Sequence, residues 1–190
     1  RTEDGGVENG EGDVLIDGRY TLLDIPYINP DECKVLPCLD NFSTNPNKTY
    51  LYNKENGEVM PWEYKGCDVC GGYLFLKNYT NYDIMNLKTG EFFIRHCILK
   101  TISRTDRILL LNPNNGGDFI FFKDCGNVAK MFRAKKVYQN DSVLARVSCD
   151  SGNGLLYLKT FEFEPGIKDM FIIKTGEEYV LATENFVTEI

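Results

Sequence analysis

The sequence predicts an all-β protein, built as an antiparallel β-sandwich or as a β-barrel. Short runs of Val, Ile, Phe, Tyr and Leu alternate with turn signals such as Asn56-Gly57 and Thr89-Gly90. β-Branched and aromatic residues favour strands, and Asn-Gly pairs favour tight hairpin turns. The best helix candidate, 127–136, is short and has no N-cap residue, so no convincing helix interrupts the pattern. Many short strands separated by turns are typical of both architectures.

The expected strands lie between residues 14 and 182. Each is a run rich in apolar or β-branched side chains, and turn-forming residues separate one run from the next. Several runs alternate polar and apolar residues, which is the pattern of a strand with one buried face. The expected strands are 14–16, 20–28, 49–52, 73–77, 92–102, 107–111, 119–122, 136–138, 143–147, 155–163, 170–173 and 179–182.

The length of 190 residues is that of one domain. With 43% hydrophobic and 13% aromatic residues, the chain can form a hydrophobic core. Segment 1–13 is rich in Gly and acidic residues and has almost no apolar side chains, so we expect a flexible lead-in. The chain begins at Arg1 without a signal peptide, and we expect it to be a processed or excised piece of a longer protein.

Charge and hydropathy exclude two classes of partner. The chain has 28 acidic and 21 basic residues, for a net charge of −7. Nucleic-acid-binding domains usually carry a basic surface, so we expect no nucleic-acid partner. No run of about 18 apolar residues is present, so we expect no membrane contact by this segment.

Glycosylation motifs indicate the compartment. The chain has four Asn-x-Ser/Thr motifs, a moderate excess over chance, and we expect glycans at Asn41, Asn47, Asn78 and Asn140. It also has seven cysteines. Both features are typical of proteins that pass through an oxidising, glycosylating route, so we expect a secreted protein or an extracellular domain.

The cysteines have three interpretations. Cys67-x-x-Cys70, together with Cys33-x₄-Cys38, has the thiolates of a tetrahedral zinc site. A redox Cys-x-x-Cys motif normally opens a helix, and none is evident here. In an oxidising compartment we favour disulfides, of undefined pairing and with one cysteine left over, and we expect no metal. The candidate disulfide cysteines are Cys33, Cys38, Cys67, Cys70, Cys97, Cys125 and Cys149.

Catalysis is not expected. His96 is the only histidine, and the adjacent Cys97 would point to the opposite face of a strand. No Cys/His or Ser/His hydrolase site is therefore predicted. A pair of acidic residues acting as in a glycosidase remains open from the sequence. No phosphate-binding loop, dinucleotide-binding glycine motif or EF-hand pattern is present, so we expect no cofactor.

Candidate binding residues are chosen by residue type. Trp62, the only tryptophan, has a ring that can stack on a sugar, although a lone tryptophan in a β-protein is more often packed in the core. A short basic cluster in this acidic chain can meet an anionic ligand, although it can also be an ordinary solvated strand. The candidate ligand-binding residues are Tyr27, Asn29, Trp62, Tyr64, Lys130, Arg133, Lys135 and Lys136.

One part of the chain resembles a known family. Between residues 119 and 171, an aromatic strand is followed by a hydrophobic run, the glycosylation motif at Asn140, a strand ending in Cys149-Asp150, and Gly166-Ile167. This order is similar to the closing part of the N-terminal domain of coronavirus spike proteins. Met60-Pro61-Trp62 before the Cys67-x-x-Cys70 motif is similar to a segment of the avian-type spikes, and the pattern is nearer to gamma- and deltacoronavirus spikes.

The resemblance implies a galectin-like antiparallel β-sandwich over 14–171, with 172–190 beginning the connector to a following domain. The parent would be a homotrimeric viral surface glycoprotein anchored in the virion membrane. Its attachment domain would bind a host cell-surface glycan, sialylated or not, or a protein receptor, without catalysis. Two departures are the absence of a second cysteine soon after Cys149 and the short length of the chain.

Other functions remain open. A secreted, lipocalin-like ligand-binding or immunomodulatory glycoprotein fits the length, acidity and cysteines. A carrier of this kind should enclose a cavity for an apolar ligand, and a sandwich should not. A purely shielding domain covered by glycans is a third hypothesis, and a secreted enzyme is a fourth.

Overall fold

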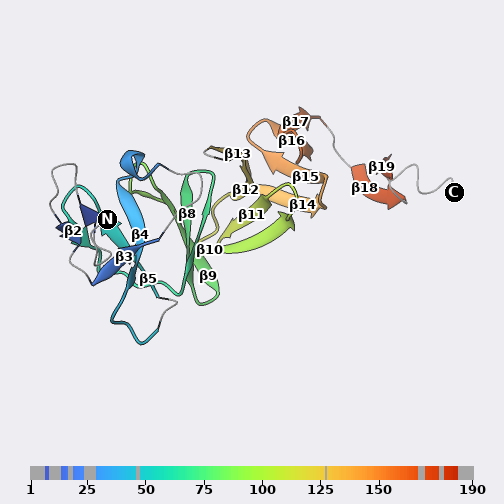
Figure 1. Cartoon of the computed structure of the whole chain (residues 1–190). Coiled ribbons are helices and arrows are strands. Elements are labelled where there is room, and N and C mark those ends of the chain that lie inside the picture. The colour runs from blue at the N-terminus through green and yellow to red at the C-terminus, as the bar shows by residue number, and fades with distance from the viewer. Residues whose placement is uncertain are drawn as a thin grey trace. The chain divides into compact units, whose positions relative to one another are not determined.

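The computed structural model describes residues 7–8, 14–16, 19–23, 29–45, 48–126, 128–166, 170–175 and 178–183. This part of the chain consists of antiparallel strands and one short 3-10 helix, η1 (Pro30–Glu32). The predicted all-β class and the face-to-face packing of antiparallel sheets are confirmed (Figure 1). No helix in the described residues is long and apolar enough to span a membrane.

The chain divides into two compact units. Unit 1 comprises Arg1–Ile98 with Cys125–Ala129, and unit 2 comprises Leu99–Asp124 with Lys130–Ile190. The sequence predicted a single sandwich domain over 14–171, so the division within that range is new. Strand β10 (Phe92–Ser103) begins in unit 1 and continues into unit 2.

Unit 1 contains the four-stranded sheet β3-β4-β5-β6, a two-stranded pair, β1-β2, and the strands β7-β8-β9 with the start of β10, which belong to a seven-stranded sheet that runs from β7 to β13. The strands of these sheets pair in chain order. Strand β1 lies inside the predicted lead-in. The strands are β1 (Val7–Glu8), β2 (Val14–Ile16), β3 (Tyr20–Leu22), β4 (Val35–Asp40), β5 (Thr49–Asn53), β6 (Glu58–Val59), β7 (Cys67–Cys70), β8 (Tyr73–Asn78) and β9 (Asn81–Asn86).

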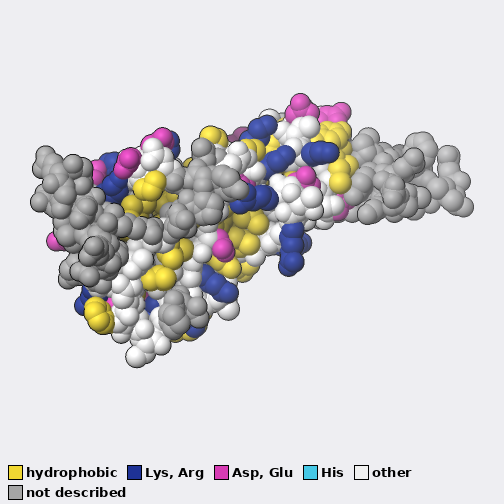
Figure 2. Space-filling view, viewed as in Figure 1, with side chains coloured by type: hydrophobic (Ala, Val, Ile, Leu, Met, Phe, Trp, Pro, Cys, Tyr) yellow, Lys and Arg dark blue, Asp and Glu magenta, His cyan; other side chains and the backbone are white. Residues whose placement is uncertain are grey.

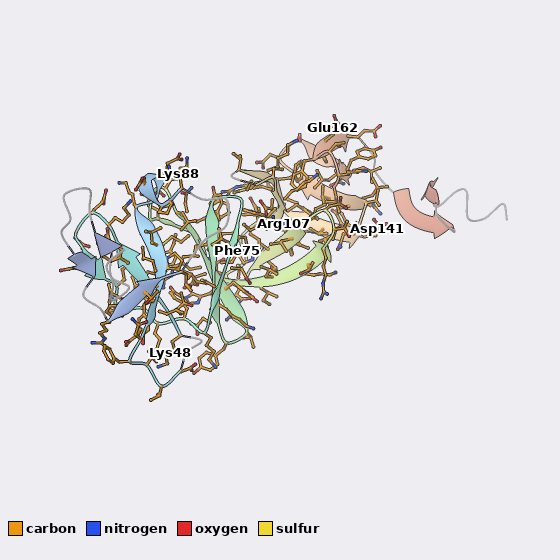
Figure 3. All side chains as sticks on the ribbon, in the orientation of Figure 1. Lys48, Phe75, Lys88, Arg107, Asp141 and Glu162 are labelled. Atoms are coloured by element: carbon orange, nitrogen blue, oxygen red, sulfur yellow. The ribbon has the colours of Figure 1, made fainter. Side chains whose placement is uncertain are left out.

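The two larger sheets of unit 1 share a core. Val35 on β4 and Leu51 on β5 belong to the same buried cluster as Leu74 on β8 and Met85 on β9. Because successive side chains alternate between the faces of a strand, one face of β8 and of β9 supplies their share of this core. Phe75, labelled on β8 in Figure 3, has the opposite parity to Leu74 and is also buried.

Unit 2 contains β11-β12-β13 and the end of β10 from the seven-stranded sheet, the four-stranded sheet β14-β15-β16-β17 and the hairpin β18-β19. Its buried cluster joins Leu110 and Phe121 of the first sheet to Val147 and Leu156 of the second. The strands are β11 (Ile108–Pro113), β12 (Phe119–Asp124), β13 (Ala129–Ala134), β14 (Lys136–Asn140), β15 (Leu144–Cys149), β16 (Gly152–Tyr157), β17 (Glu162–Pro165), β18 (Met170–Thr175) and β19 (Glu178–Thr183).

Strand β4 was not predicted, and it contains Pro37, which cannot donate to a ladder and is of a residue type rare in central strands. The structure shows how it is accommodated. The carbonyl oxygen of Pro37 accepts a 2.9 Å hydrogen bond from the Leu23 nitrogen, just beyond the end of β3 at Leu22. In an antiparallel ladder the N–H and C=O of one residue face the same neighbour. The Pro37 nitrogen, which has no hydrogen to donate, therefore faces the chain just beyond the end of β3, where the ladder between β3 and β4 stops.

Segment 127–136, the best helix candidate but not an expected helix, contains strand β13 in its described part, and Phe132 and Ala134 pack into the core of unit 2. One expected strand was wrong. The expected strand 155–163 is two strands, β16 and β17, separated by a turn in which Phe161 has a φ of 64°. Strands β6, β7 and β9 were also missed, because they are short or interrupted by polar residues.

Gly154 on β16 has no room for a side chain. A Cβ atom there would collide with the carbonyl oxygen of Glu164 and would lie 2.6 Å from the Phe163 ring. We expect Gly154→Ala to lower the free energy of unfolding by about 1–3 kcal/mol, because the backbone of β17 must move. Chemical denaturation measures the change. Gly117→Ala, where the nearest atom lies 3.5 Å away, is the matched control, and equal losses in both variants would contradict the packing described.

Candidate functional site

An aromatic and basic cluster in unit 1 is the candidate functional site. The ring centroids of Trp62 and Phe92 are 5.2 Å apart and the rings are inclined at 59°. The Arg95 guanidinium carbon lies 4.5 Å from the Phe92 centroid and 5.8 Å from the Trp62 centroid. The Trp62 side chain remains 39% exposed. We call Trp62, Phe92, Arg95 and His96 the Trp62–Arg95 cluster.

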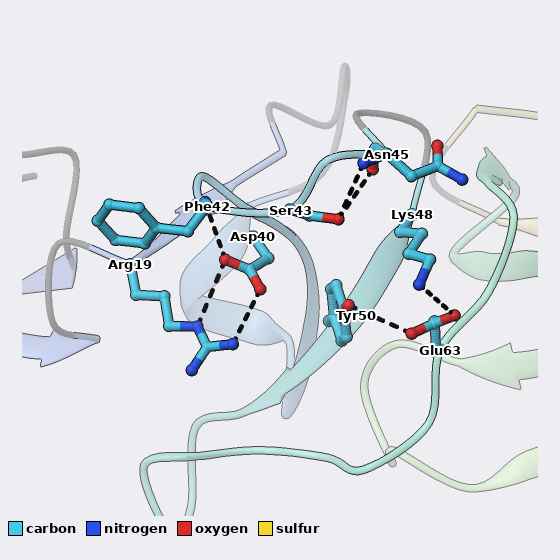
Figure 4. A network of polar contacts seen from close by, with 8 residues as sticks. All are labelled: Arg19, Asp40, Phe42, Ser43, Asn45, Lys48, Tyr50 and Glu63. Carbon is cyan, nitrogen blue, oxygen red and sulfur yellow. Dashed lines mark hydrogen bonds and ion pairs between the residues drawn. The ribbon is translucent and has the colours of Figure 1, made fainter.

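The loop that carries Trp62 is held on both sides. Tyr64 forms an isolated bridge with Thr49 on β5, with backbone hydrogen bonds of 2.8 and 2.9 Å. Glu63 receives an ion pair of 2.8 Å from Lys48 and a hydrogen bond of 3.4 Å from the Tyr50 hydroxyl (Figure 4). The Lys48 ammonium also lowers the pKa of the Glu63 carboxyl, so this contact stays charged. Trp62 is therefore presented by a loop fastened to β5.

Beneath the cluster lies a buried carboxylate, Asp83 on β9, whose side chain is only 3% exposed. Its Oδ1 accepts a 2.7 Å hydrogen bond from the His96 backbone nitrogen. Its Oδ2 accepts a 3.3 Å hydrogen bond from the Tyr64 hydroxyl and lies 3.6 Å from an Arg95 guanidinium nitrogen. The Nδ1 atom of His96 is 3.7 Å from Oδ1. A buried carboxylate needs such partners to offset its lost hydration.

Asp83 also stabilises a bulge in β10. The pairing of β10 with β9 shifts between Ile94 and Cys97, and His96 has a φ of 56°. This left-handed conformation costs roughly 1–2 kcal/mol for a residue with a Cβ atom. The charge-assisted hydrogen bond from the His96 N–H to Asp83 offsets that cost. The bulge directs Arg95 and His96 to the surface, where their side chains are 49% and 61% exposed.

Tyr64 is a buried support of the site. Burial, followed by the nearby Asp83 charge and its hydrogen bond, raises the pKa of Tyr64 to about 12. The hydroxyl therefore stays protonated and donates to Asp83 at physiological pH. Of the predicted candidates, Trp62 lies at the surface of the cluster and Tyr64 lies below it, with 4% exposure.

The arrangement suits binding. An exposed indole face can stack on the apolar face of a sugar ring, and a guanidinium group can donate several hydrogen bonds to carboxylate or hydroxyl oxygens. The Asp83 contact uses one side of the Arg95 guanidinium. No group of three or more His, Cys, Asp or Glu side chains in the described residues could hold a metal ion.

The other predicted candidates of unit 1 lie elsewhere. Asn29 caps η1, and its side chain accepts a 3.1 Å hydrogen bond from the Asp31 nitrogen. The same helix is fastened by a 2.6 Å ion pair between Glu32 and Lys88, the latter labelled in Figure 3. Tyr27 lies outside the described residues. The structure therefore gives Asn29 a structural role at the start of a short helix.

The predicted basic cluster of unit 2 does not form one patch. Lys130 reaches the Thr160 carbonyl oxygen at 3.4 Å, on the same strand face as the buried Ala134, whereas Arg133 has the opposite parity on β13. Lys135 forms a 2.5 Å ion pair with Asp150, and Lys136 is exposed at the start of β14. On the face visible in Figure 2, basic side chains are interspersed with acidic ones.

The first glycosylation motif lies in a well-fixed turn. The Asp40 carboxylate accepts hydrogen bonds from the Arg19 guanidinium at 3.0 and 3.4 Å and from the Phe42 nitrogen at 3.0 Å (Figure 4). The guanidinium lowers the pKa of Asp40. The Oδ1 atom of Asn41 accepts a 2.9 Å hydrogen bond from Thr21. A glycan would be attached through Nδ2, so this bond is compatible with modification.

Two of the other three glycosylation motifs begin at the end of a strand, and the third has its asparagine outside the described residues. Asn78 ends β8, and the hairpin turn after it carries Tyr79 at a φ of 52° with 72% exposure. Asn140 ends β14 and is half-buried. Asn47 lies outside the described residues. Glycosylation at all four positions stays a prediction.

The cysteines occupy different environments. Cys33, Cys38, Cys67, Cys97 and Cys149 carry unbridged thiols in the structure, whereas the sequence predicts disulfides. Burial raises the pKa of Cys38 to about 12 and those of Cys67 and Cys97 to about 11, so these thiols are poor nucleophiles. The Cys97 thiol donates to the Tyr82 carbonyl oxygen at 3.4 Å.

Sequence reasoning missed Phe92, Arg95 and Asp83. Arg95 and Phe92 were seen only as parts of an expected strand. The available signal was Asp83, a lone charge within the run Tyr82-Asp83-Ile84-Met85, at the parity that faces the core. A charge at such a position needs a polar partner, and Arg95 on the next strand supplies one.

Comparisons with known proteins place the chain in no family. No protein-family model matches the sequence, and no curated protein matches it with statistical significance. The functional argument therefore depends on the residues themselves.

Replacing the buried carboxylate tests its supporting role. We expect Asp83→Asn to lower the free energy of unfolding by about 1–3 kcal/mol, because asparagine loses the charge that pairs with Arg95 and its amide nitrogen cannot accept a hydrogen bond. Urea denaturation measures the loss. Asp68→Asn, at an exposed position in the same sheet, is the matched control. A loss no larger than that of the control would show that the Asp83 contacts do not support the bulge.

Alkaline titration tests the Tyr64 environment. The folded-state pKa of about 12 exceeds the ordinary value of 10.0, so the folded state holds its proton more tightly than the unfolded state. The contribution of Tyr64 to stability is complete below pH 10 and is lost as the pH rises toward 12. We expect Tyr64→Phe to lose stability less steeply than the unmodified chain across this window. Tyr79→Phe, which removes an exposed phenol, is the matched control in the same denaturation series.

Proposed function

We propose that this chain is the attachment domain of a viral surface glycoprotein and that it binds a host cell-surface glycan through the Trp62–Arg95 cluster. The observation that carries the proposal is the exposed Trp62 ring beside Arg95, with Phe92 and the buried Asp83 holding the guanidinium in place. Such a site has no need of catalytic groups. The domain acts as a binding module, outside the cell, as one copy of a homotrimer.

Preorganisation supports a binding role for the cluster. A long, flexible arginine side chain loses conformational entropy when it binds a ligand. Here the Phe92 ring and the Asp83 carboxylate already restrict the Arg95 side chain, so less entropy remains to be lost. The Trp62 loop is fastened through Glu63 and Tyr64. Both contact groups are therefore held in position before a ligand arrives.

Electrostatics favour the cluster over other surfaces. An anionic sugar would be repelled by a chain of net charge −7 unless its site is locally positive. Arg95 supplies a permanent positive charge, and His96 adds a second donor beside it. The predicted basic residues of unit 2 are a weaker candidate, because Lys130 and Arg133 have opposite parity on β13 and so do not project from one face.

The resemblance to coronavirus spike N-terminal domains and the glycosylation motifs support an extracellular attachment role. Single glycan contacts are weak, so a trimeric parent would supply avidity. The galectin-like arrangement that the resemblance implies stays a prediction. A secreted lipocalin-like or immunomodulatory protein is the alternative, but each sheet in the described residues is open, with two edge strands, whereas a lipocalin-like carrier needs a closed sheet.

Multivalent display of the full chain on cells tests the proposal. We expect saturable binding to cells or to an immobilised glycan panel. We expect Trp62→Ala and Arg95→Gln each to raise the half-saturating concentration about tenfold or more, which corresponds to ~1.4 kcal/mol per contact. Sialidase treatment of the cells shows whether the bound glycan is sialylated.

The controls match residue type at exposed positions away from the cluster. Phe42→Ala removes an exposed aromatic ring of unit 1, and Arg104→Gln removes an exposed arginine of unit 2. Both should bind as the unmodified chain does. Binding that is unaffected by Trp62→Ala and Arg95→Gln would overturn this site assignment. Binding that survives removal of all glycans would replace the glycan with a protein receptor.

A further inference from the structure

The segment Cys125–Ala129 is a separate piece of unit 1 that returns after the chain has entered unit 2. It lies against the hairpin between β7 and β8. A Cβ atom at Gly71 would be 2.8 Å from the Ala129 Cβ and 3.0 Å from the Ala129 Cα and nitrogen. Gly71 also has a φ of 58°, as its hairpin turn requires. The absence of a side chain at Gly71 therefore brings two distant parts of the chain into backbone contact.

Each side of this contact carries a cysteine. Cys70 is the last residue of β7 and immediately precedes Gly71. Cys125 begins the returning segment, and its backbone nitrogen donates a 2.9 Å hydrogen bond to the Val128 carbonyl oxygen. That bond folds the segment back on itself, so Cys125 is held close to Val128 and therefore close to Ala129. Cys125 is exposed and Cys70 is half-buried, so neither is enclosed in the core.

The face of the sheet from which Cys70 projects can be read from the strand register. Cys67 and Val69 pair with Leu76 and Leu74 and pack against the core shared by the two sheets of unit 1. Cys70 pairs with Tyr73 and has the opposite parity to Val69, so it projects from the other face. Tyr73 packs there against Phe93, with ring centroids 5.4 Å apart.

This placement excludes the other cysteines of unit 1 as partners of Cys70. Cys33 and Cys67 belong to the shared core on the opposite face. Cys38 lies in the other sheet, in a buried cluster with Tyr52. Cys97 pairs with Tyr82, which pairs with Lys77, four residues along β8 from Tyr73. Four residues of strand span about 13 Å, beyond the roughly 7 Å limit for the Cα atoms of a disulfide.

We propose that Cys70 and Cys125 form a disulfide that fastens the returning segment to the β7–β8 hairpin. The Sγ–Sγ bond forms as the two thiols give up two protons and two electrons. A disulfide-bonded thiol carrier of an oxidising compartment, such as glutathione disulfide, accepts them; its own S–S bond breaks and yields two thiols. The bond would close the loop that contains β8 to β12.

Peptide mapping of the full chain, secreted from eukaryotic cells, tests the assignment. Free thiols are first alkylated without reduction, and the chain is then cut on the N-terminal side of aspartate. Cleavage before Asp68 separates Cys67 from Cys70, so peptides 68–82 and 124–140 each contain one cysteine. N-glycans are removed after digestion. We expect a linked species of these two peptides that separates into both components on reduction.

Variants provide the second readout. In Cys70→Ser we expect Cys125 to become fully alkylated before reduction. In Cys125→Ser we expect Cys70 to become fully alkylated before reduction. Cys149→Ser, which alters a thiol of unit 2 that contacts Ser151, should leave the linked peptide unchanged. Alkylation of both cysteines in the unmodified chain, or a link from either cysteine to a different one, would overturn the proposal. The mapping of the unmodified chain remains decisive if a variant fails to fold.

Discussion

The buried Asp83 carboxylate is the interaction on which the candidate site depends. It accepts hydrogen bonds from the His96 backbone amide and the Tyr64 phenol, and it lies 3.6 Å from the Arg95 guanidinium. These contacts offset the cost of placing a charge in the core, and they stabilise the left-handed conformation of His96. The same group therefore sets the path of β10 and the position of Arg95. Stability and binding geometry are coupled through one side chain.

Unit 2 also contains a buried aspartate that contacts a residue with a positive φ. Asp124 ends β12 with a side chain that is 2% exposed, and it forms a 2.6 Å ion pair with Arg107. Arg107 has a φ of 53° and accepts a 3.2 Å backbone hydrogen bond from the Asp124 nitrogen. In both units a buried aspartate therefore contacts a residue in the left-handed region, His96 in unit 1 and Arg107 in unit 2. A short polar contact compensates the backbone strain at the place where a strand must bend or begin.

Local sequence predicted the strands whose apolar residues form continuous runs. Strands β8, β11 and β12 are of this kind, because alternation and β-branched residues act within a few positions. It failed at β4, where the tolerance for Pro37 depends on where a neighbouring strand ends. It failed again at β13, where packing of Phe132 decides between helix and strand. Both outcomes depend on tertiary contacts, and a local sequence pattern carries no information about such contacts.

The candidate site shows the same division. The lone tryptophan drew attention by residue type, and Trp62 does lie in the cluster. Residue type alone did not identify its partners. Asp83 and Arg95 come together at a bulge in β10, and no turn motif in the sequence marks the position of that bulge. The basic run from Lys130 to Lys136 was misleading for the opposite reason. Residues close in sequence are separated by the two faces of a strand and by their own ion pairs.

The interleaving of the two units has a consequence for biosynthesis. Because unit 1 takes Cys125–Ala129 from beyond Asp124, it is incomplete when the ribosome has made its first 98 residues. The hairpin at Gly71 must wait for Ala129 to emerge before its final contact can form. Unit 1 and the intervening part of unit 2 must therefore mature together during translation. For the same reason, genetic exchange of unit 1 between related chains would need two crossover intervals and not one.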